Sequence, residues 1–408
     1  MDLIAKELQK PNYGEQNTSA NKVARGANGF AFRLSAALLE NSSSENFVCS
    51  PFSVWLPLAA LVNATDNHNK QKLLAVLNAE GISEENINNA ASRLLYDLKN
   101  ENYRRYAEMY DEPYYDQMKI TNALFVDKDI TVRREFEQTF LDCYCGHTMN
   151  VDFSSDEAIK AINEWVRENT ENLISEIVQG FDSETIVSMA NAIYYSGRWI
   201  WEFEHGQTKK DVFYSPKGEA SAFFMLREGD EQEYYEDDSI QAMPLKYMNG
   251  GGMYIILPKQ EDAEEILKAM TSERFIDIQK NTIKATGKLL LPRFSIESDL
   301  LDLGGTLTTI GVPLFDEIAA PLTGGLIEEN KPVWLSGATH KAVIKVTELG
   351  TTAAAISLLA ICAGGMPEII PTEPFEMICN KPFAFLLYEH THDGGNQVLF
   401  TGIVNRPY

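Results

Sequence analysis

The sequence lacks the features that mark membrane proteins, disulfide-stapled proteins and metalloproteins. Its first 22 residues contain no long apolar stretch of the kind found in secretion signals, and no later segment could span a bilayer. The five cysteines are an odd number and are scattered without metal-ligand spacing, so they form no disulfide framework. We expect an extracellular or cell-surface protein whose signal is absent from this sequence, while a cytoplasmic location stays open.

Positive charge is also scarce. The chain has 35 lysines and arginines against 59 aspartates and glutamates, which gives a net charge of −24. A surface this acidic repels phosphate backbones and anionic lipids, so we expect no nucleic-acid partner and no membrane insertion. With 44% hydrophobic residues the chain can build a large core, and its 408 residues alone suggest two domains.

Sequence motifs of catalysis are absent as well. There is no Gly-x-Ser-x-Gly nucleophile elbow, and Gly250–Gly252 is not followed by the Lys-Ser/Thr pair of a phosphate loop. Gly304-Gly305 lacks the spacing of a dinucleotide-binding turn. The run His390-Thr-His-Asp offers metal-type ligands, but its place between two strand-like runs favours a hairpin turn. We expect no enzyme, no catalytic residue, no cofactor and no metal.

Apolar periodicity predicts mainly helices in the first half of the chain and strands in the second. Helical patterns cover Lys22–Glu40, Leu56–Leu77, Glu84–Leu98 and Asp156–Gln179. Strand-like runs are ITNALFV, VSMANAIYY, MYIILP, KLLLPRFSI, HKAVIKV, PFAFLLYE and VLFTGIV. Such segregation of helices and strands is typical of an α+β fold.

The most unusual stretch of the chain lies between Glu348 and Pro382. Leu349–Met366 contains no charge and no proline, and a polar, acidic, proline-broken run continues to Pro374. Local sequence alone favours an alanine-rich buried helix. The same residues also suit an exposed loop that can be buried as a strand, because nothing in them forbids either state.

Several motifs follow one another in the order found in one protein family. They are NFVCSPFSV, MANAIYYSGRWIWEF, LLLPRFSIE, LGGTLTTIGVPLF, SGATHKAVIKVTELGTTAAA, NKPFAFLLYE and VLFTGIVNRPY. Through these motifs the chain from about Lys22 to Tyr408 resembles the serpins, the serine-protease inhibitors that trap their targets, and among them prokaryotic-type members. One departure is AAPLTGG, in which Pro321 stands where the family usually has an acid.

The resemblance implies one α+β domain over residues 1–408. Its serpin fold would comprise a large five-stranded sheet, two smaller sheets, about nine helices and an exposed reactive-centre loop. Residues 1–21 would form an N-terminal extension, and residues 348–374 would form the hinge and the reactive-centre loop. A single domain of this kind replaces the two domains that the length suggests.

The resemblance also implies a mechanism for the unusual stretch. In serpins a protease cleaves the loop, which then inserts into the main sheet as a new strand. Insertion requires hinge residues without charge or bulk at alternating positions, and the small residues after Gly350 meet this requirement. The expected hinge residues are Glu348, Gly350, Thr351, Thr352, Ala353, Ala354 and Ala355.

From this pattern we expect a suicide-substrate inhibitor that acts as a monomer and forms a covalent 1:1 complex with serine proteases. The alternative is a non-inhibitory serpin-fold protein with a binding or chaperone-like role. No arginine or lysine lies near the expected cleavage site, so elastase-like or subtilisin-like targets are favoured over trypsin-like ones. The family's usual spacing puts the reactive bond between Gly364 and Gly365, with Cys362, Ala363 and Met366 as alternatives.

A second set of site residues follows from the resemblance alone. Ser50, Ser53, Asn191 and His340 match the polar cluster that serpins place beneath the point where the main sheet opens. Trp199 matches an aromatic residue near the position at which the loop first enters the sheet. Hydrogen-bonding groups at such a place can hold a closed sheet and then re-form around an added strand.

Overall fold

The computed structural model describes residues 18–98, 118–351 and 374–407, apart from short gaps at 41, 43–44, 171, 182–184, 249, 330 and 392–394. The expected N-terminal extension falls almost wholly outside this range. So does the reactive-centre loop from residue 352 to residue 373.

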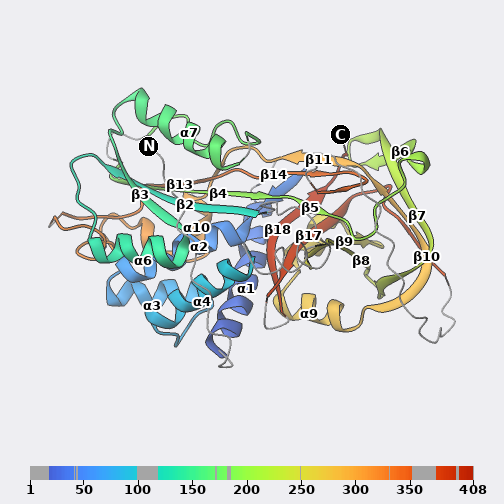
Figure 1. Cartoon of the computed structure of the whole chain (residues 1–408), viewed down its shortest axis with the longest axis horizontal. Helices are drawn as coiled ribbons and strands as arrows, with labels where there is room; N and C mark the ends of the chain where they lie inside the picture. The colour runs from blue at the N-terminus through green and yellow to red at the C-terminus, as the bar shows by residue number, and fades with distance from the viewer. Residues whose placement is uncertain are drawn as a thin grey trace, which may run out of the picture.

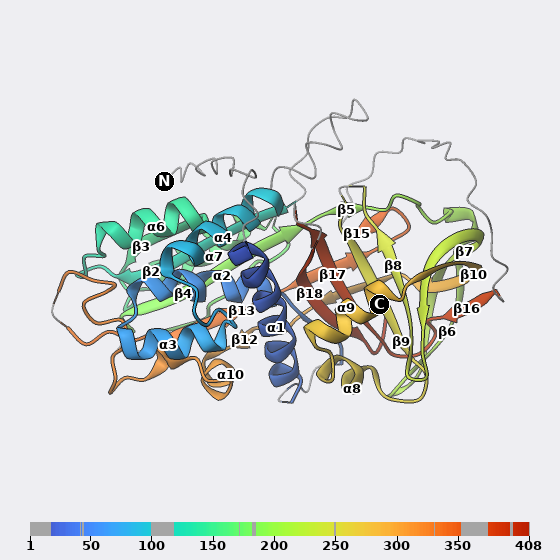
Figure 2. The ribbon, with the colours of Figure 1, turned by 90° about the horizontal axis from the view of Figure 1, so that it is seen from below.

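The described chain has a helix-rich half and a strand-rich half (Figure 1). Its helices are α1 (Thr18–Glu40), α2 (Pro51–Leu61), α3 (Asn67–Val76), α4 (Glu84–Tyr96), α6 (Arg134–Tyr144), α7 (Asp156–Asn169), α8 (Ala263–Lys268), α9 (Ser272–Lys280) and α10 (Gly304–Thr309). Helix α1 lies between the two halves and packs on α4 and α2 on one side and on strand β18 (Asn396–Val404) and α8 on the other (Figure 2).

The strand-rich half is built on a sheet of nine strands within the described residues. These are β1 (Phe47–Cys49), β18, β17 (Phe383–His390), β9 (Gly252–Pro258), β8 (Ile240–Lys246), β7 (Gly218–Glu236), β10 (Ile283–Pro292), β16 (Phe375–Ile378) and β6 (Lys209–Ser215). Strand β7 is 19 residues long and pairs with β10 and β6 along one part and with β8 at its end. Its length joins the two smaller sheets expected from the sequence into one.

A five-stranded sheet crosses the helix-rich half, and the resemblance to the serpins implies a large sheet of this size. Its order is β12 (Leu301–Asp302), β13 (Gly337–His340), β4 (Val187–Tyr195), β2 (Met118–Asp127) and β3 (Gly146–Val151). Helix α7 covers one face and α2 packs on the other (Figure 1). Under α7 the ring of Trp165 meets Phe125 of β2 edge-on, with their centroids 5.9 Å apart. The sheet is therefore buried on both faces.

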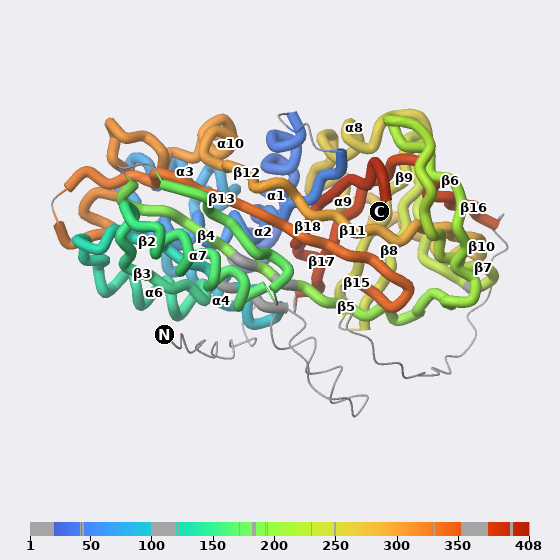
Figure 3. The backbone as a smooth tube through the Cα atoms, turned by 90° about the horizontal axis from the view of Figure 1, so that it is seen from above, coloured from blue at the N-terminus to red at the C-terminus, as the bar shows by residue number. Residues whose placement is uncertain are grey.

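A further group of four strands continues this sheet toward the strand-rich half (Figure 3). Its members, in order, are β11 (Phe294–Glu297), β14 (Val343–Val346), β15 (Gly350–Thr351) and β5 (Gly197–Arg198). Strand β4 continues as β5 after one residue, and β13 continues as β14 after two. The main sheet is thus a long surface in which two strands run from end to end.

The helices confirm most of the expected positions and correct two. The pattern over Leu56–Leu77 is interrupted at Asp66, whose carboxylate accepts hydrogen bonds from the N–H groups of His68 and Asn69 and so starts α3 as a new helix. The pattern over Asp156–Gln179 predicts too long a helix, because α7 ends at Asn169. The apolar residues beyond this end pack under α7 without continuing it.

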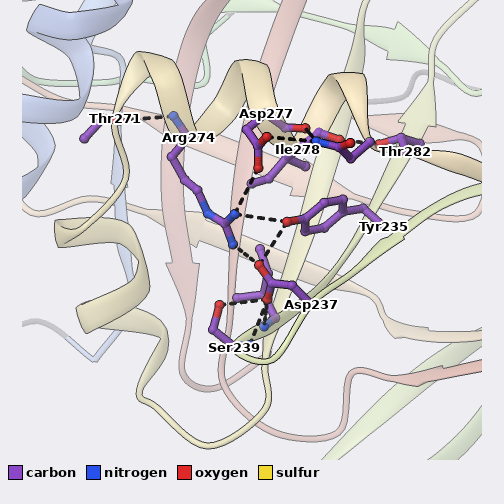
Figure 4. Close-up of polar contacts among 10 residues, drawn as sticks. Tyr235, Asp237, Ser239, Thr271, Arg274, Asp277, Ile278 and Thr282 are labelled. Carbon is purple, nitrogen blue, oxygen red and sulfur yellow. Dashed lines mark hydrogen bonds and ion pairs between the residues drawn. The ribbon is translucent and has the colours of Figure 1, made fainter.

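A polar network fastens α9 to the turn between β7 and β8 (Figure 4). The guanidinium of Arg274 donates to the hydroxyl of Tyr235 at 3.0 Å and forms an ion pair with Asp237. Asp237 also accepts from the N–H of Ser239 at 2.8 Å. Burial opposes ionisation of this carboxyl, but the hydrogen bonds from Arg274 and from the turn outweigh burial and lower its pKa. The turn is therefore held closed at this end of the hairpin.

Candidate functional site at the hinge and the sheet opening

The first hinge residues lie inside the main sheet. Strand β15 pairs with β14 on one side, where Thr351 lies opposite Val346. On its other side Gly350 lies opposite Arg198 and Thr351 opposite Gly197, both in β5. The hinge therefore begins as a strand between two others, antiparallel to both, with Thr351 only 1% exposed.

Farther from the hinge, β4, which continues as β5, pairs directly with β13, which continues as β14. In the described residues β13 pairs with β4 at two positions only, Gly337 with Ser188 and Ala338 with Met189. Farther along, β15 separates the continuations of these strands. The main sheet is thus closed at one end and split at the other, and the split already holds the start of the hinge.

Gly350 occupies a position that suits glycine alone. Its φ is +154°, and a Cβ atom there would lie 2.0 Å from the carbonyl oxygen of Gly197. The N–H of Thr347 donates to the carbonyl of Gly350 at 2.9 Å, which closes the turn between β14 and β15. This turn sets the point at which the chain reverses and enters the sheet.

Glu348 is a buried charge at the base of the hinge, with 1% of its surface exposed. Arg293 Nε donates to its Oε1 at 2.6 Å, and Thr208 Oγ1 donates to the same oxygen at 2.6 Å. Burial opposes ionisation of Glu348, but these hydrogen bonds outweigh it and lower the pKa of the carboxyl. His205 lies 3.7 Å away, so a positive charge there would add to the attraction.

An aromatic pair supports the hinge from one side. The indole of Trp199 is fully buried and stacks on the ring of Tyr247 with centroids 4.5 Å apart, while its Nε1 donates to the carbonyl of Thr347 at 3.0 Å. The hydroxyl of Tyr247 is hydrogen-bonded to Thr351. The expected role of Trp199 beside the hinge therefore has a geometric basis.

Three residues that support the hinge are not predicted from the sequence: Arg293, Thr208 and Tyr247. Arg293 had a usable signal, since it is a charge inside the apolar run LLLPRFSI. A basic residue at such a position needs an anionic partner. The partner, Glu348, is 55 residues away along the chain, and periodicity cannot pair residues at that distance.

The expected sheet-opening cluster brings three of its members into hydrogen-bonded contact. The N–H of Ser50 donates to Nε2 of His340 at 3.0 Å, and the hydroxyl of Ser53 donates to the carbonyl of Ser50 at 2.8 Å. Burial lowers the pKa of His340 to about 4, so its imidazole is neutral at physiological pH. Because Nε2 accepts a hydrogen bond, the ring proton sits on Nδ1.

Asn191, the fourth expected member of the cluster, lies on β4. Its side-chain amide donates to Oδ1 of Asn122 on β2 at 2.5 Å, and Asn122 donates to the carbonyl of Tyr144 at 2.6 Å. The pairing of β13 with β4 ends at Ala338 and Met189, and the same register continued by two residues would bring His340 opposite Asn191. The cluster thus lies beneath the part of the sheet where direct pairing of these two strands stops.

The remaining expected site residues lie outside the described residues. They are Thr352, Ala353, Ala354 and Ala355 of the hinge and Cys362, Ala363, Gly364, Gly365 and Met366 around the reactive bond. In the part of the chain that the structure describes, no group of His, Cys, Asp and Glu is arranged to hold a metal ion. No helix of that part is both long and apolar enough to cross a membrane.

Comparison with known proteins identifies this architecture. A sequence model of the family described as serpin (serine protease inhibitor) matches residues 25–407. The chain belongs to the serpin family. A serine protease inhibitor of Mus musculus is 28% identical over 100% of this chain and 93% of the relative. A serpin-like protein of Thermococcus kodakarensis is also 28% identical, over 94% of this chain and 86% of its own length.

Solved serpin structures share the fold. The thermophilic serpin tengpin in its native state has a TM-score of 0.78 at 24% identity, covering 98% of this chain and 96% of tengpin. Human thyroxine-binding globulin in complex with its ligand has a TM-score of 0.79 at 23% identity, covering 96% and 100%. The serpin fold of this chain is therefore established. Its relatives named as protease inhibitors place it in a family of inhibitors, not of catalysts.

Proposed function

We propose that this serpin is a suicide-substrate inhibitor of serine proteases that traps the acyl-enzyme by inserting its cleaved loop into the main sheet. The observation that carries the proposal is the position of Gly350 and Thr351 between β5 and β14. A strand that starts in a split sheet can extend along the split by adding residues in the same register. Small, uncharged residues follow Thr351 in the sequence, as this extension requires.

The free energy of the added hydrogen bonds favours insertion of the cleaved loop into the main sheet. About a dozen new ladder hydrogen bonds, at about 0.5–1.5 kcal/mol net each, contribute on the order of 10 kcal/mol. A protease still ester-linked to the loop would be carried along with it. Because a displacement of about 1 Å in an active site can lower a rate ~100-fold, distortion of the protease would leave the ester unhydrolysed.

Other features of the proposal rest on sequence. The uncharged residues around Gly364 and Gly365 suit the shallow specificity pockets of elastase-like or subtilisin-like enzymes. We also propose a 1:1 covalent complex, a monomeric inhibitor, an extracellular or cell-surface location and membership of the prokaryotic-type serpins. A non-inhibitory role is the second candidate, since human thyroxine-binding globulin has the same fold and binds thyroxine.

Incubation with elastase-type and subtilisin-type proteases tests the proposal. We expect a covalent complex that survives boiling in detergent, and mass spectrometry of the released peptide locates the reactive bond. Cleavage without complex formation by every protease tested would favour the non-inhibitory candidate. The thermal midpoint of cleaved protein adds a test of insertion, because a completed sheet should melt at a higher temperature than the intact protein.

A further inference from the structure

Strands β7 and β8 separate soon after the turn that joins them. The described strands pair at Tyr235 with Ala242 and at Glu236 with Gln241, and this pairing goes no further. If the same antiparallel register continued two residues beyond Tyr235 and Ala242, Pro244 would lie opposite Glu233. Proline has no N–H to donate, so it cannot complete a hydrogen-bonded ladder at that position. The hairpin is closed at its turn and open beyond it.

A cavity of about 130 Å³ occupies the opening. Both strands line it, β7 through Gln232 and its neighbours and β8 through Met243 and Pro244, and Trp201 forms part of the wall. An engineered apolar cavity of about 150 Å³ is large enough for benzene. The space between β7 and β8 therefore admits a ligand the size of one aromatic ring.

Gln232 brings a buried side-chain amide without hydrogen-bond partners to this cavity. Its side chain is 6% exposed, and neither its Oε1 nor its Nε2 has a hydrogen-bond partner among the described residues. A buried amide without hydrogen-bond partners destabilises the folded protein. The amide offers a donor and an acceptor side by side, so a matching ligand must present an acceptor and a donor side by side.

The other walls define the rest of the ligand. Trp201 is 59% exposed, so its indole face is accessible for stacking against a planar ring. Lys246 is paired with Glu233 at 2.5 Å and Lys284 with Glu231 at 3.2 Å. These two ion pairs balance their own charges. The remaining charged residue of the lining, Arg227, donates to the carbonyl of Trp201 and lies 4.4 Å from the centre of the Phe203 ring. An uncharged ligand enters without breaking any of these contacts.

We propose that the cavity between β7 and β8 binds a small, uncharged, planar lactam or aromatic amide. The ligand pairs its N–H and C=O with the side-chain amide of Gln232 and stacks its ring on Trp201. Neither Glu348 nor Thr351 lines this site, although Trp201 belongs to the segment between Trp199 and Phe203 that donates hydrogen bonds to the hinge. Ligand binding here does not require protease inhibition.

Ligand-observed NMR titration of the full chain with 2-pyridone tests the proposal. We expect saturable 1:1 binding, and binding at least tenfold weaker for N-methyl-2-pyridone, which has the same ring and carbonyl but no N–H. Equal binding of the two compounds would overturn the proposed pairing with Gln232. Failure of both to saturate would mean that the cavity holds water only, and would overturn the site.

Gln232→Leu separates ligand binding from folding. This variant should bind 2-pyridone at least tenfold more weakly, leave N-methyl-2-pyridone unchanged, and melt at a higher temperature because an unpaired buried amide is gone. A lower melting temperature would show that the amide is satisfied in the folded protein and would contradict the proposal. Trp201→Ala should weaken both compounds. Phe223→Ala, which removes another exposed aromatic residue from β7, is the matched control and should weaken neither.

Discussion

The two ends of the seam between β4 and β13–β14 are held by different chemistry. At the closed end, Ser50, Ser53 and a neutral His340 form hydrogen bonds without a net charge. At the split end, the buried carboxylate of Glu348 meets Arg293. Neutral hydrogen bonds can be exchanged around a new strand at modest cost, whereas a buried ion pair is costly to break. In the proposed mechanism, the split end anchors the base of the hinge and the closed end opens to admit the new strand.

A charge introduced at Thr351 should have the largest effect on the hinge and on inhibition. Thr351→Arg places a guanidinium in the sheet beside Tyr247, and burial of an unpaired charge costs several kcal/mol. We expect the hinge to leave the sheet and the protein to become a protease substrate, with complex yield reduced more than about tenfold. Gel analysis of complex against cleaved product measures this. Thr351→Val is the uncharged control, and a Thr351→Arg protein that still forms complexes at the wild-type yield would contradict the hinge assignment.

Acid should weaken the closed end. His340 has a pKa of about 4 in the folded protein and about 6.5 in an unfolded chain, so the unfolded chain binds this proton first as the pH falls. The stability contributed by neutral His340 is present above pH 6.5 and is lost on the way down to about pH 4, by about 3 kcal/mol.

Urea unfolding at pH 7 and pH 4.5 measures this loss. His340→Gln keeps an acceptor for the N–H of Ser50 but cannot titrate, so its stability should depend less steeply on pH over this interval. His68→Gln, at an exposed histidine, is the control and should follow the wild type. Identical pH profiles for His340→Gln and wild type would contradict a buried neutral histidine.

Removal of the positive charge of Arg293 should destabilise the protein at the split end of the seam. Arg293→Met leaves the carboxylate of Glu348 buried without this partner. We expect a loss of roughly 2–3 kcal/mol, less than the 3–5 kcal/mol of a fully buried pair, because the Arg293 side chain is 38% exposed.

The pKa of Glu348 is lowered in the folded protein, so wild-type stability from this group is present above the unfolded pKa and lost as the pH falls through the folded pKa. Arg293→Met should weaken that acid dependence. Chemical unfolding across pH 3–7 measures both effects, with Arg134→Met at an exposed position as the control. No change in stability for Arg293→Met would mean that Glu348 is not held as an ion.

The smallest expected effect concerns the aromatic support. Tyr247→Phe keeps the stack on Trp199 and removes the hydroxyl that bonds Thr351, at a cost of about 1 kcal/mol. A double-mutant cycle with Thr351→Val isolates this bond, and a coupling energy near zero would remove Tyr247 from the hinge support. Unfolding of the four proteins in urea supplies the cycle.

The sequence predicts this molecule unevenly, and the reason is the range of the interactions involved. Helix α1 follows from apolar periodicity and strand β9 from a short continuous apolar run, and both are local properties of the sequence. The helical pattern beyond Asn169 misleads, because its apolar residues pack under α7 without extending it. The expected roles of the polar cluster and of Trp199 follow from the resemblance of motifs to those of the serpins. The contacts of Glu348 with Arg293 and Thr208 come from residues far away in the chain, which neither method pairs.

The segment that follows β5 has backbone amides that point in two directions. The N–H groups of Trp199 and Phe203 donate to the hinge carbonyls of Leu349 and Glu348, whereas the N–H of Ile200 donates to the carbonyl of Lys246 on β8. Neighbouring amides therefore report on different partners in a hydrogen–deuterium exchange experiment. If the hinge leaves the sheet while β8 stays in place, Trp199 and Phe203 exchange quickly and Ile200 remains protected, so one short stretch of chain distinguishes hinge release from opening of the whole sheet.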